Sequence, residues 1–416
     1  MKRLIPAVLT GALVAGALLG LGSAASAQTA GSLDPTFGNN GVVLTNLGLN
    51  SGGSQIEAEP SSAALLSNGD ILVAGNFGLV RYLPSGTLDT TFGTDGIAAL
   101  PSGISSLFGV TLAVQSNGEI VVAAEETAPN GTGGSFAVVR YNATGSIDTT
   151  FGTDGVASTA FANSDVQGPD SILVQSNGDI LVAGEALLNS YHAPPEAAMA
   201  RFTTNGTIDT TFGADGQVTN LSEGNFSAVG EDASGDIFVL PGDLEYSATG
   251  QLDSAVTPEP ITASSQSGSA VFESSGQYVI GSSDEIAKHN IDVEVQLFNA
   301  GGTVAASTGP FNYSDTTTLS NLEDTAGAVA VQPNGQIVVA GAQYNFSTSV
   351  FGLARVDTNG SLDSSFGNNG TVLTTIQGDE GASAVLIQPN GDIVVVGYSE
   401  DNSTGLTDLA LARYLG

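Results

Sequence analysis

The chain has 416 residues and a formal net charge of −34, because 42 acidic residues are opposed by only 8 lysines and arginines. Phosphate binding needs clustered basic side chains, so this composition argues strongly against nucleic acids and anionic membranes as partners. The chain has no cysteine, so no disulfide stabilises it and the fold must depend on burial of apolar side chains.

The first 27 residues have the pattern of a secretory signal peptide. Lys2 and Arg3 give a positive start, an apolar core surrounds 13–21, and Ala25-Ser26-Ala27 forms a small-residue cleavage site. The apolar run is short for a helix that spans a bilayer, which needs about 20 residues. We therefore expect cleavage after Ala27, a secreted, periplasmic or cell-surface location, no membrane insertion of the mature chain, and a single domain at 28–416.

A short turn centred on Asn-Gly or Ser-Gly recurs seven times in the mature chain. Each copy precedes a short apolar run such as Ile71-Leu72-Val73, a combination typical of a β-hairpin, and we expect primed turns in which glycine adopts a positive φ. The spacing of about 41 to 60 residues between the central glycines indicates a solenoid or a propeller. These glycines are Gly69, Gly118, Gly178, Gly235, Gly276, Gly335 and Gly391.

A second motif, Leu/Ile-Asp-x-x-Phe-Gly, recurs in phase with the hairpins. Its aspartate can accept hydrogen bonds from the backbone N–H groups that follow, and its phenylalanine supplies apolar area, so the motif predicts a tight turn. Two further copies, at Leu252-Asp253 and at 302–305, are degenerate. The runs between these motifs predict four short strands per repeat and no helix in the mature chain. The five complete copies begin at Leu33, Leu88, Ile147, Ile208 and Leu362.

The joint pattern resembles a known bacterial repeat. The hairpin Gln388-Pro389-Asn390-Gly391, the strand ending in Arg413-Tyr414 and the turn motif Gly31-Ser32-Leu33-Asp34 together are similar to the delta-60 repeat, and the resemblance covers essentially the whole mature chain. It implies a β-propeller. It brings no catalytic residues, because the general function of that family is not established.

The two ends of the repeat array fit a closed ring. The last repeat stops after Arg413-Tyr414, where the others continue into Gly-Ser-Leu-Asp, and the missing piece stands at 31–34. In a propeller this arrangement lets the first strand complete the last blade. We therefore predict an all-β fold, a seven-bladed β-propeller of four-stranded antiparallel blades closed by the N-terminal strand.

Five arginines occupy one position of the repeat. In four copies an aspartate follows eight residues later, and ring closure would bring the fifth arginine to the first aspartate. We predict structural ion pairs that tie each strand to its turn. In one degenerate copy Leu297 and Ala305 replace both partners together, as pairing predicts. In the other copy Glu245 replaces the arginine while Asp253 is kept, which contradicts pairing. The predicted pairs are Arg81 with Asp89, Arg140 with Asp148, Arg201 with Asp209, Arg355 with Asp363, and Arg413 with Asp34.

Alternating strand directions sort the loops onto two faces. The hairpins and the Asp-x-x-Phe-Gly turns share one face, and the variable connections share the other, which is rich in acidic residues. This acidic rim either keeps the protein soluble or forms an interaction surface for a cationic partner, divalent ions or a glycan. The candidate binding residues are Glu125, Glu126, Asp165, Asp170, Glu185, Asp243, Asp284, Glu285, Glu323, Asp324, Asp379, Glu380, Glu400 and Asp401.

No cofactor or metal site is assigned. Paired carboxylates can ligate Ca²⁺, but none of the acidic clusters has the Asp-x-Asn/Asp-x-Asn/Asp-Gly loop that makes calcium binding specific. The recurring segments Asn39-Asn40-Gly41, Thr94-Asp95-Gly96 and Thr153-Asp154-Gly155 are better explained as turns.

No catalytic residue is assigned either. The two histidines, His192 and His289, lie outside the repeat register and beside no serine motif. We therefore favour a monomeric, non-catalytic binding or scaffold protein outside the cell or at its surface, with a protein or glycan ligand. The alternative is a carbohydrate hydrolase or lyase that uses two carboxylates of the acidic face, although the chain has no tryptophan to stack on a sugar.

Overall fold

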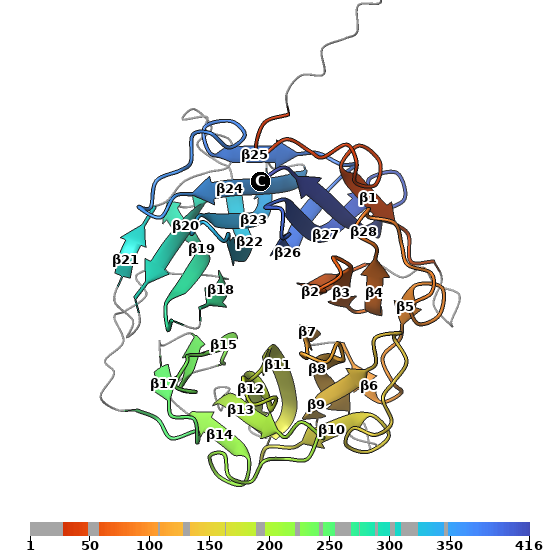
Figure 1. Ribbon diagram of the computed structural model, residues 1–416, viewed down its shortest axis with the longest axis vertical. Helices are drawn as coiled ribbons and strands as arrows, with labels where there is room; N and C mark the ends of the chain where they lie inside the picture. Colours follow the sequence, from red (N-terminus) through yellow and green to blue (C-terminus); the bar gives the residue numbers. More distant parts are fainter. Residues whose placement is uncertain are drawn as a thin grey trace, which may run out of the picture.

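The computed structural model describes residues 28–416 except 49–57, 107–108, 128–133, 163, 189–195, 221–224, 241–243, 254–267, 274, 288–289, 300–303, 309–322 and 345–347. The predicted signal peptide, 1–27, lies outside the described residues. The described chain contains 28 strands and no helix. Figure 1 shows the strands as seven blades around a central channel, which confirms the predicted propeller.

Each blade is an antiparallel sheet whose strands follow one another outward from the channel. Blades 1 and 2 contain β2 (Pro60–Leu65), β3 (Ile71–Gly75), β4 (Gly78–Tyr82) and β5 (Ile97–Ala98), then β6 (Ile104–Ser105), β7 (Thr111–Val114), β8 (Ile120–Thr127), β9 (Gly134–Tyr141) and β10 (Val156–Thr159). Blades 3 and 4 contain β11 (Ser164–Val174), β12 (Ile180–Leu188), β13 (Glu196–Phe202) and β14 (Gln217–Asn220), then β15 (Ala228–Glu231), β16 (Ile237–Leu240) and β17 (Leu244–Tyr246).

The remaining strands form blades 5 to 7. Blade 5 contains β18 (Gly268–Phe272), β19 (Tyr278–Ala287), β20 (Asn290–Phe298) and β21 (Val304–Ser307), and blade 6 contains β22 (Glu323–Val331), β23 (Ile337–Tyr344), β24 (Ser349–Val356) and β25 (Thr371–Thr374). Blade 7 contains β26 (Glu380–Ile387), β27 (Ile393–Asp401), β28 (Leu406–Tyr414) and β1 (Val42–Thr45). Within the described residues blade 4 has three strands, and one parallel bridge links blades 5 and 6.

The N-terminal strand closes the ring. β1 pairs antiparallel with β28, placing Val42 opposite Ala412 and Thr45 opposite Leu409. Leu33 adds a bridge to Tyr414 just before this pairing. The first strand therefore completes the last blade, as predicted from the circular break in the repeats.

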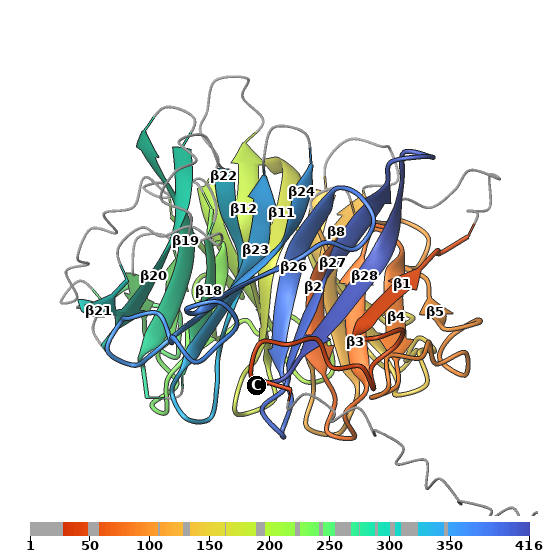
Figure 2. The same ribbon diagram turned by 90° about the horizontal axis from the view of Figure 1, so that it is seen from above.

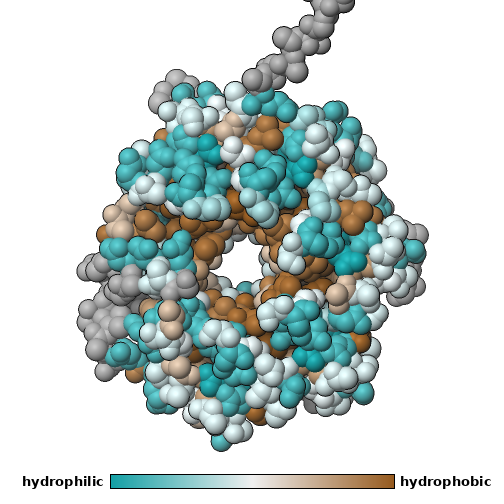
Figure 3. Space-filling model, viewed as in Figure 1, coloured by the Kyte–Doolittle hydropathy of each residue, from teal (hydrophilic) through white to brown (hydrophobic). Residues whose placement is uncertain are grey.

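The hydrophobic core lies between the blades. On β3, Ile71 and Val73 pack in a cluster with Val394 of blade 7, whereas Leu72 packs with Ile120 of blade 2. Successive strand residues point to opposite faces of a sheet, so a strand covered by a blade on each side reads as a continuous apolar run. The space-filling view in Figure 3 shows the channel open at the centre, with apolar residues around it.

The Asn-Gly hairpins differ from the primed turns expected. Gly69 has a φ of 88°, but Asn68 is not among the residues with positive φ, and a primed I′ turn needs positive φ at both. The hydrogen bonds are those of a type I turn with a glycine bulge. The Gly69 amide donates to the Leu66 carbonyl, and the Leu66 amide donates to the Asp70 carbonyl. Asn68 is favoured because its side-chain oxygen accepts the Asp70 amide at 3.1 Å.

Two consecutive residues with positive φ occur instead after the Phe-Gly motif. Asp95 and Gly96 have φ of 52° and 96°, and the Thr94 amide donates to the Ile97 carbonyl at 2.7 Å. The same geometry recurs at four other sites, as expected for the Asn/Asp-Gly turns. The equivalent non-glycine residues are Asn40, Asp154, Asp215 and Asn369.

The hairpins and the Asp-x-x-Phe-Gly turns lie on one face of the ring, and the variable connections lie on the opposite face. Arg81 contacts both Asp70 of the hairpin and Asp89 of the Asp-x-x-Phe-Gly turn, so these two loops share a face. In Figure 2 the C-terminus marks this hairpin face at the lower edge, and the variable connection between β27 and β28 lies at the upper edge. We refer to the second surface as the variable face.

The Phe-Gly motifs connect neighbouring blades. The Gly93 amide of blade 1 donates to the Thr144 carbonyl of blade 2 at 2.8 Å, and Gly145 lies against Phe92. The same amide-to-carbonyl bond occurs at five of the seven junctions within the described residues. The donors are the amides of Gly38, Gly93, Gly152, Gly213 and Gly367.

This crowding predicts different costs for two Gly→Ala substitutions at similar φ. A Cβ at Gly145, with φ of 82°, would lie 2.8 Å from the Gly93 amide and 2.9 Å from the Phe92 ring, whereas a Cβ at Gly118, with φ of 87°, would meet nothing within 4 Å. Backbone strain alone costs about 1–2 kcal/mol, and overpacking adds about 1–3 kcal/mol. Urea unfolding should therefore show a clearly larger loss of stability for Gly145→Ala. Equal losses would contradict the contact between blades.

Candidate functional site

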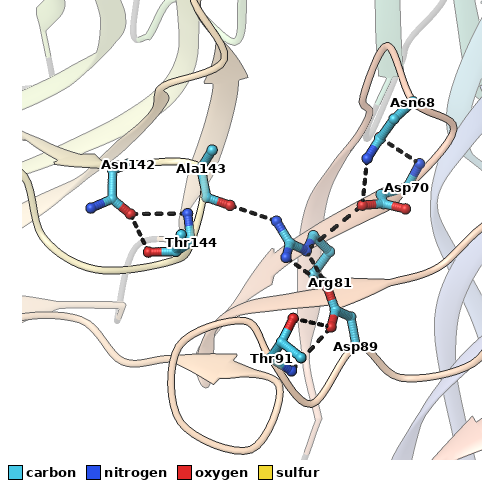
Figure 4. Close-up of polar contacts among 8 residues, drawn as sticks. All are labelled: Asn68, Asp70, Arg81, Asp89, Thr91, Asn142, Ala143 and Thr144. Carbon is cyan, nitrogen blue, oxygen red and sulfur yellow. Dashed lines mark hydrogen bonds and ion pairs between the residues drawn. The ribbon is translucent and has the colours of Figure 1, made fainter.

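The arginine of blade 1 contacts its own turn and the next blade (Figure 4). The Arg81 Nε and Nη2 atoms both donate to one oxygen of Asp89, at 2.8 and 2.6 Å. The other Asp89 oxygen accepts the amide and hydroxyl of Thr91, and the Arg81 guanidinium lies 4.6 Å from the centre of the Phe92 ring. Its Nη1 donates to the Ala143 carbonyl of blade 2. We call this arrangement the arginine latch.

All five predicted arginine-aspartate pairs are present as ion pairs with this geometry. The Nε to Oδ2 distance is 2.8 Å in every copy, and every guanidinium lies 4.6 Å from the phenylalanine of its turn. In four copies Nη1 also donates to a carbonyl of the next blade. These acceptors are the carbonyls of Ala143, Thr204, Ala248 and Pro84.

The pairing lowers the pKa of the aspartates. At Asp363 burial acts to raise the pKa, but hydrogen bonds from the hydroxyl and amide of Ser365 and from Arg355 outweigh it, and the pKa falls to about 2. At Asp148 the largest cause of the lowered pKa is the hydrogen bond from the Thr150 hydroxyl. Folding therefore favours the ionised carboxylate.

One degenerate copy has the opposite charge balance. Glu245 takes the arginine position in blade 4, where burial raises its pKa, followed by the charges of Asp236, Asp253 and Asp232. Because Glu245 replaces the arginine of the other copies, the arginine-aspartate pair does not form at this position of blade 4.

A double-mutant cycle tests whether the latch stabilises the fold. We expect Arg140→Ala and Asp148→Ala each to destabilise the protein, because each leaves a largely buried partner without its counter-charge. The double variant should lose less than the sum of the two, with a coupling energy of about 1–2 kcal/mol in urea unfolding. Additive losses would show that the pair contributes nothing beyond its separate residues.

The variable face holds only part of the predicted rim. Among the described side chains, six rim residues are exposed or half-buried: Glu126, Asp170, Glu185, Asp379, Glu400 and Asp401. Asp243 lies outside the described residues, as do the side chains of Asp165, Asp284, Glu285 and Glu323.

Three predicted rim residues are inside the protein, which corrects that expectation. Glu125 is 6% exposed, and Asp324 and Glu380 are fully buried. Glu380 is buried because one carboxylate oxygen accepts the amides of Ile376, Gln377 and Gly378 at 2.8–3.0 Å. It holds the loop before β26 in place and does not belong to the exposed rim.

Two rim carboxyl groups lie close together at the junction of blades 3 and 4. Asp170 occupies a β-bulge of the innermost strand β11 and accepts a hydrogen bond from Asn225 at 3.3 Å. Burial and the nearby charge of Glu185 raise the pKa of Asp170 to about 6, and burial raises the pKa of Glu185. Both residues belong to the rim predicted from sequence, but their proximity depends on the register of β11 with β12, which the sequence does not reveal.

The raised pKa of Asp170 predicts a pH-dependent effect on stability. The carboxyl ionises more readily in the unfolded chain, so its ionisation disfavours folding as the pH rises from about 4 to about 6 and above. The Asp170 side chain keeps access to solvent although surrounding atoms partly desolvate its carboxyl group, so solvent screening keeps the effect small. Asp170→Asn should raise the Tm by about 1–2 °C at neutral pH and leave it unchanged near pH 4. Thermal scans with the same shift at both pH values would contradict this assignment.

The described residues contain neither a metal-binding cluster nor a membrane-spanning helix. No group of three histidine, aspartate or glutamate side chains in the described part is placed to hold a metal ion. The same part of the chain contains no helix long and apolar enough to cross a membrane.

Several solved structures are similar to the chain at low sequence identity. The extracellular domain of a protein described as a hybrid two-component system from B. thetaiotaomicron is 13% identical, with a TM-score of 0.45. The match covers 90% of this chain, which spans 40% of that one. A protein of unknown function from Dyadobacter fermentans is 10% identical over 90% of this chain and 99% of its own, with a TM-score of 0.46.

An enzyme also appears among these structures. The α-L-arabinofuranosidase of Fusarium graminearum is 9% identical over 89% of this chain and 97% of its own, with a TM-score of 0.45. No curated protein matches the chain significantly.

A family model recognises the repeats. The model described as "Domain of unknown function (DUF5122) beta-propeller" matches residues 66–92, 115–151, 175–212 and 332–366. Each match runs from the residue before the Asn-Gly hairpin to the phenylalanine of the following turn. Four of the seven repeats are therefore similar to this β-propeller model.

Proposed function

We propose that this protein is an exported β-propeller of the delta-60 type, which binds a cationic partner through its variable face without catalysis. The motifs that resemble the delta-60 repeat, together with the pattern of a signal peptide at 1–27, support the family and the export. The partner carries lysine or arginine side chains on a protein surface or peptide.

The separation of charge between the two faces carries this proposal. The arginines Arg81, Arg140, Arg201, Arg355 and Arg413 are the basic residues of the described chain, and each is paired with an aspartate on the hairpin face. Within the described residues the carboxylates of the variable face therefore have no lysine or arginine beside them. Acidic loops around one opening concentrate negative potential, which attracts and orients a cationic partner.

No observation favours the alternative of a carbohydrate hydrolase or lyase. The arabinofuranosidase match has too little similarity to support an activity. Asp170 and Glu185 are neighbouring carboxyl groups of the variable face. Burial raises both pKa values, and the charge of Glu185 adds to the shift at Asp170, so no catalytic role is needed to explain them.

Binding of a fluorescent oligolysine peptide tests the charged surface. Neutralising three residues of the variable face, with Glu59→Gln, Glu126→Gln and Glu400→Gln in one variant, should weaken peptide binding about tenfold at low salt. Added salt should weaken binding to the unaltered protein, because screening reduces the attraction between exposed charges.

The hairpin face offers a control with the same change of net charge. Asp95, Asp154 and Asp215 are exposed there, and Asn40 and Asn369 occupy the same turn position in two other repeats, so asparagine fits the backbone at all three sites. The triple Asp→Asn variant should bind the peptide within about twofold of the unaltered protein. Equal weakening by both variants would show that net charge alone attracts the peptide and would reject the proposed surface.

A further inference from the structure

A groove lies between blades 2 and 3 on the hairpin face, away from the acidic rim. It encloses about 760 Å³ and is lined by the hairpins around Asn117 and Asn177, by the turn at Thr204, and at its base by Val114 and Val174. Grooves of this size are typical of sites for small molecules. Neither the fold nor the proposed function requires a groove at this junction.

A glutamine precedes the hairpin in four blades, and the copies differ in what they contact. The Gln332 amide donates to the Gly391 carbonyl of the next blade at 3.2 Å, and the Gln175 amide donates to Glu231 of blade 4 at 3.2 Å. The Gln388 side-chain oxygen accepts Arg413. Three of the four glutamines therefore bond to a neighbouring group.

Gln115 is different, and it lines the groove. The residue is 8% exposed, and within the described part of the chain its side-chain amide forms no hydrogen bond. The Gln175 Oε1 atom, on the opposite wall, is buried without a partner as well. Buried amide groups are rarely left without hydrogen bonds. The terminal torsion of glutamine has a broad energy minimum, so the free Gln115 amide can turn either its oxygen or its NH₂ group toward the groove.

The groove has polar walls and one carboxylate among its lining residues. This carboxylate is Glu119, whose Oε2 atom lies 3.3 Å from Nη1 of Arg140, and Arg140 also pairs with Asp148. The other polar groups are amides and hydroxyls, which both donate and accept hydrogen bonds. Such walls suit a neutral ligand that carries adjacent donors and acceptors. A vicinal diol can pair with the two terminal atoms of an amide or with a carboxylate.

We propose that the groove between blades 2 and 3 binds a neutral saccharide, whose hydroxyl groups hydrogen-bond the amides of Gln115 and Gln175. The site is separate from the variable face and performs no chemistry. At this junction a sugar hydroxyl accepts the equivalent of the hydrogen bond that the Gln332 NH₂ group of blade 6 donates to the Gly391 carbonyl of the next blade.

The chain itself provides a suitable test variant. Leu66 occupies the position of Gln115 in blade 1, so leucine is compatible with this turn. Gln115→Leu should weaken binding of the sugar about tenfold, because it removes two hydrogen-bonding atoms from the site. Gln332→Leu makes the same substitution in blade 6, outside the groove, and should leave sugar binding unchanged. Thermal melts of both variants establish that each is folded.

The probes are maltose, cellobiose, lactose and trehalose, with putrescine as a charged comparison. Binding is followed by the NMR signals of the glutamine side-chain amides, which the two leucine variants assign. We expect at least one disaccharide to shift the Gln115 signal and to leave the Gln332 signal in place. Perturbation by putrescine alone, or no shift of the Gln115 signal with any of the four sugars, overturns the proposal.

Two further variants separate this site from the other parts of the molecule. Glu119→Gln places at this position the residue found in blade 6 as Gln336, and it should retain sugar binding within about threefold because the ligand is neutral. Loss of binding in this variant would indicate a cation site instead. The triple variant of the variable face should bind the sugar normally, so failure of either proposal is distinguishable from failure of the other.

Discussion

The ring depends on arginines that are held by one blade and reach the next. A buried arginine-aspartate pair is expensive to desolvate, and it stabilises a protein only where the remaining donors and acceptors are also satisfied. Here the aspartate receives two N–H groups from the arginine on one oxygen and the amide and hydroxyl of Thr91 or its counterparts on the other. The guanidinium is covered by a phenylalanine ring, a favourable cation–π arrangement. The Nη1 atom of the guanidinium then donates to a carbonyl of the neighbouring blade, so the same side chain stabilises a turn and a junction between blades.

Much of the fold could be predicted from sequence because its signals are local and repeated. The number of hairpin motifs, seven, predicted the number of blades, and a constant separation of eight residues predicted the arginine-aspartate pairs. Contacts between repeats could not be found in this way. Arg140 donates to the Thr204 carbonyl, 64 residues away, and any residue type can supply a carbonyl. The positions of the acidic residues were likewise only partly predictable, because charge in a loop segment does not reveal whether backbone amides enclose it, as they do Glu380.

The two faces differ in how their charges are used. On the hairpin face of the described chain, five carboxylates are neutralised by arginine and have a lowered pKa. On the variable face, the exposed carboxylates Glu126, Glu400 and their neighbours have no such counter-ions among the described residues. A few arginine side chains can therefore stabilise the scaffold while the opposite surface keeps a strong negative potential. The degenerate blade 4 interrupts this division, since Glu245 adds negative charge where the other blades carry arginine.

The pairing of β1 with β28 also affects how the chain folds. Arg413 and Asp34 are 379 residues apart, so the last blade joins segments that are far apart in the described chain. Contacts of such long sequence separation slow folding. β1 is only four residues long, which limits the risk that its free edge pairs with another chain.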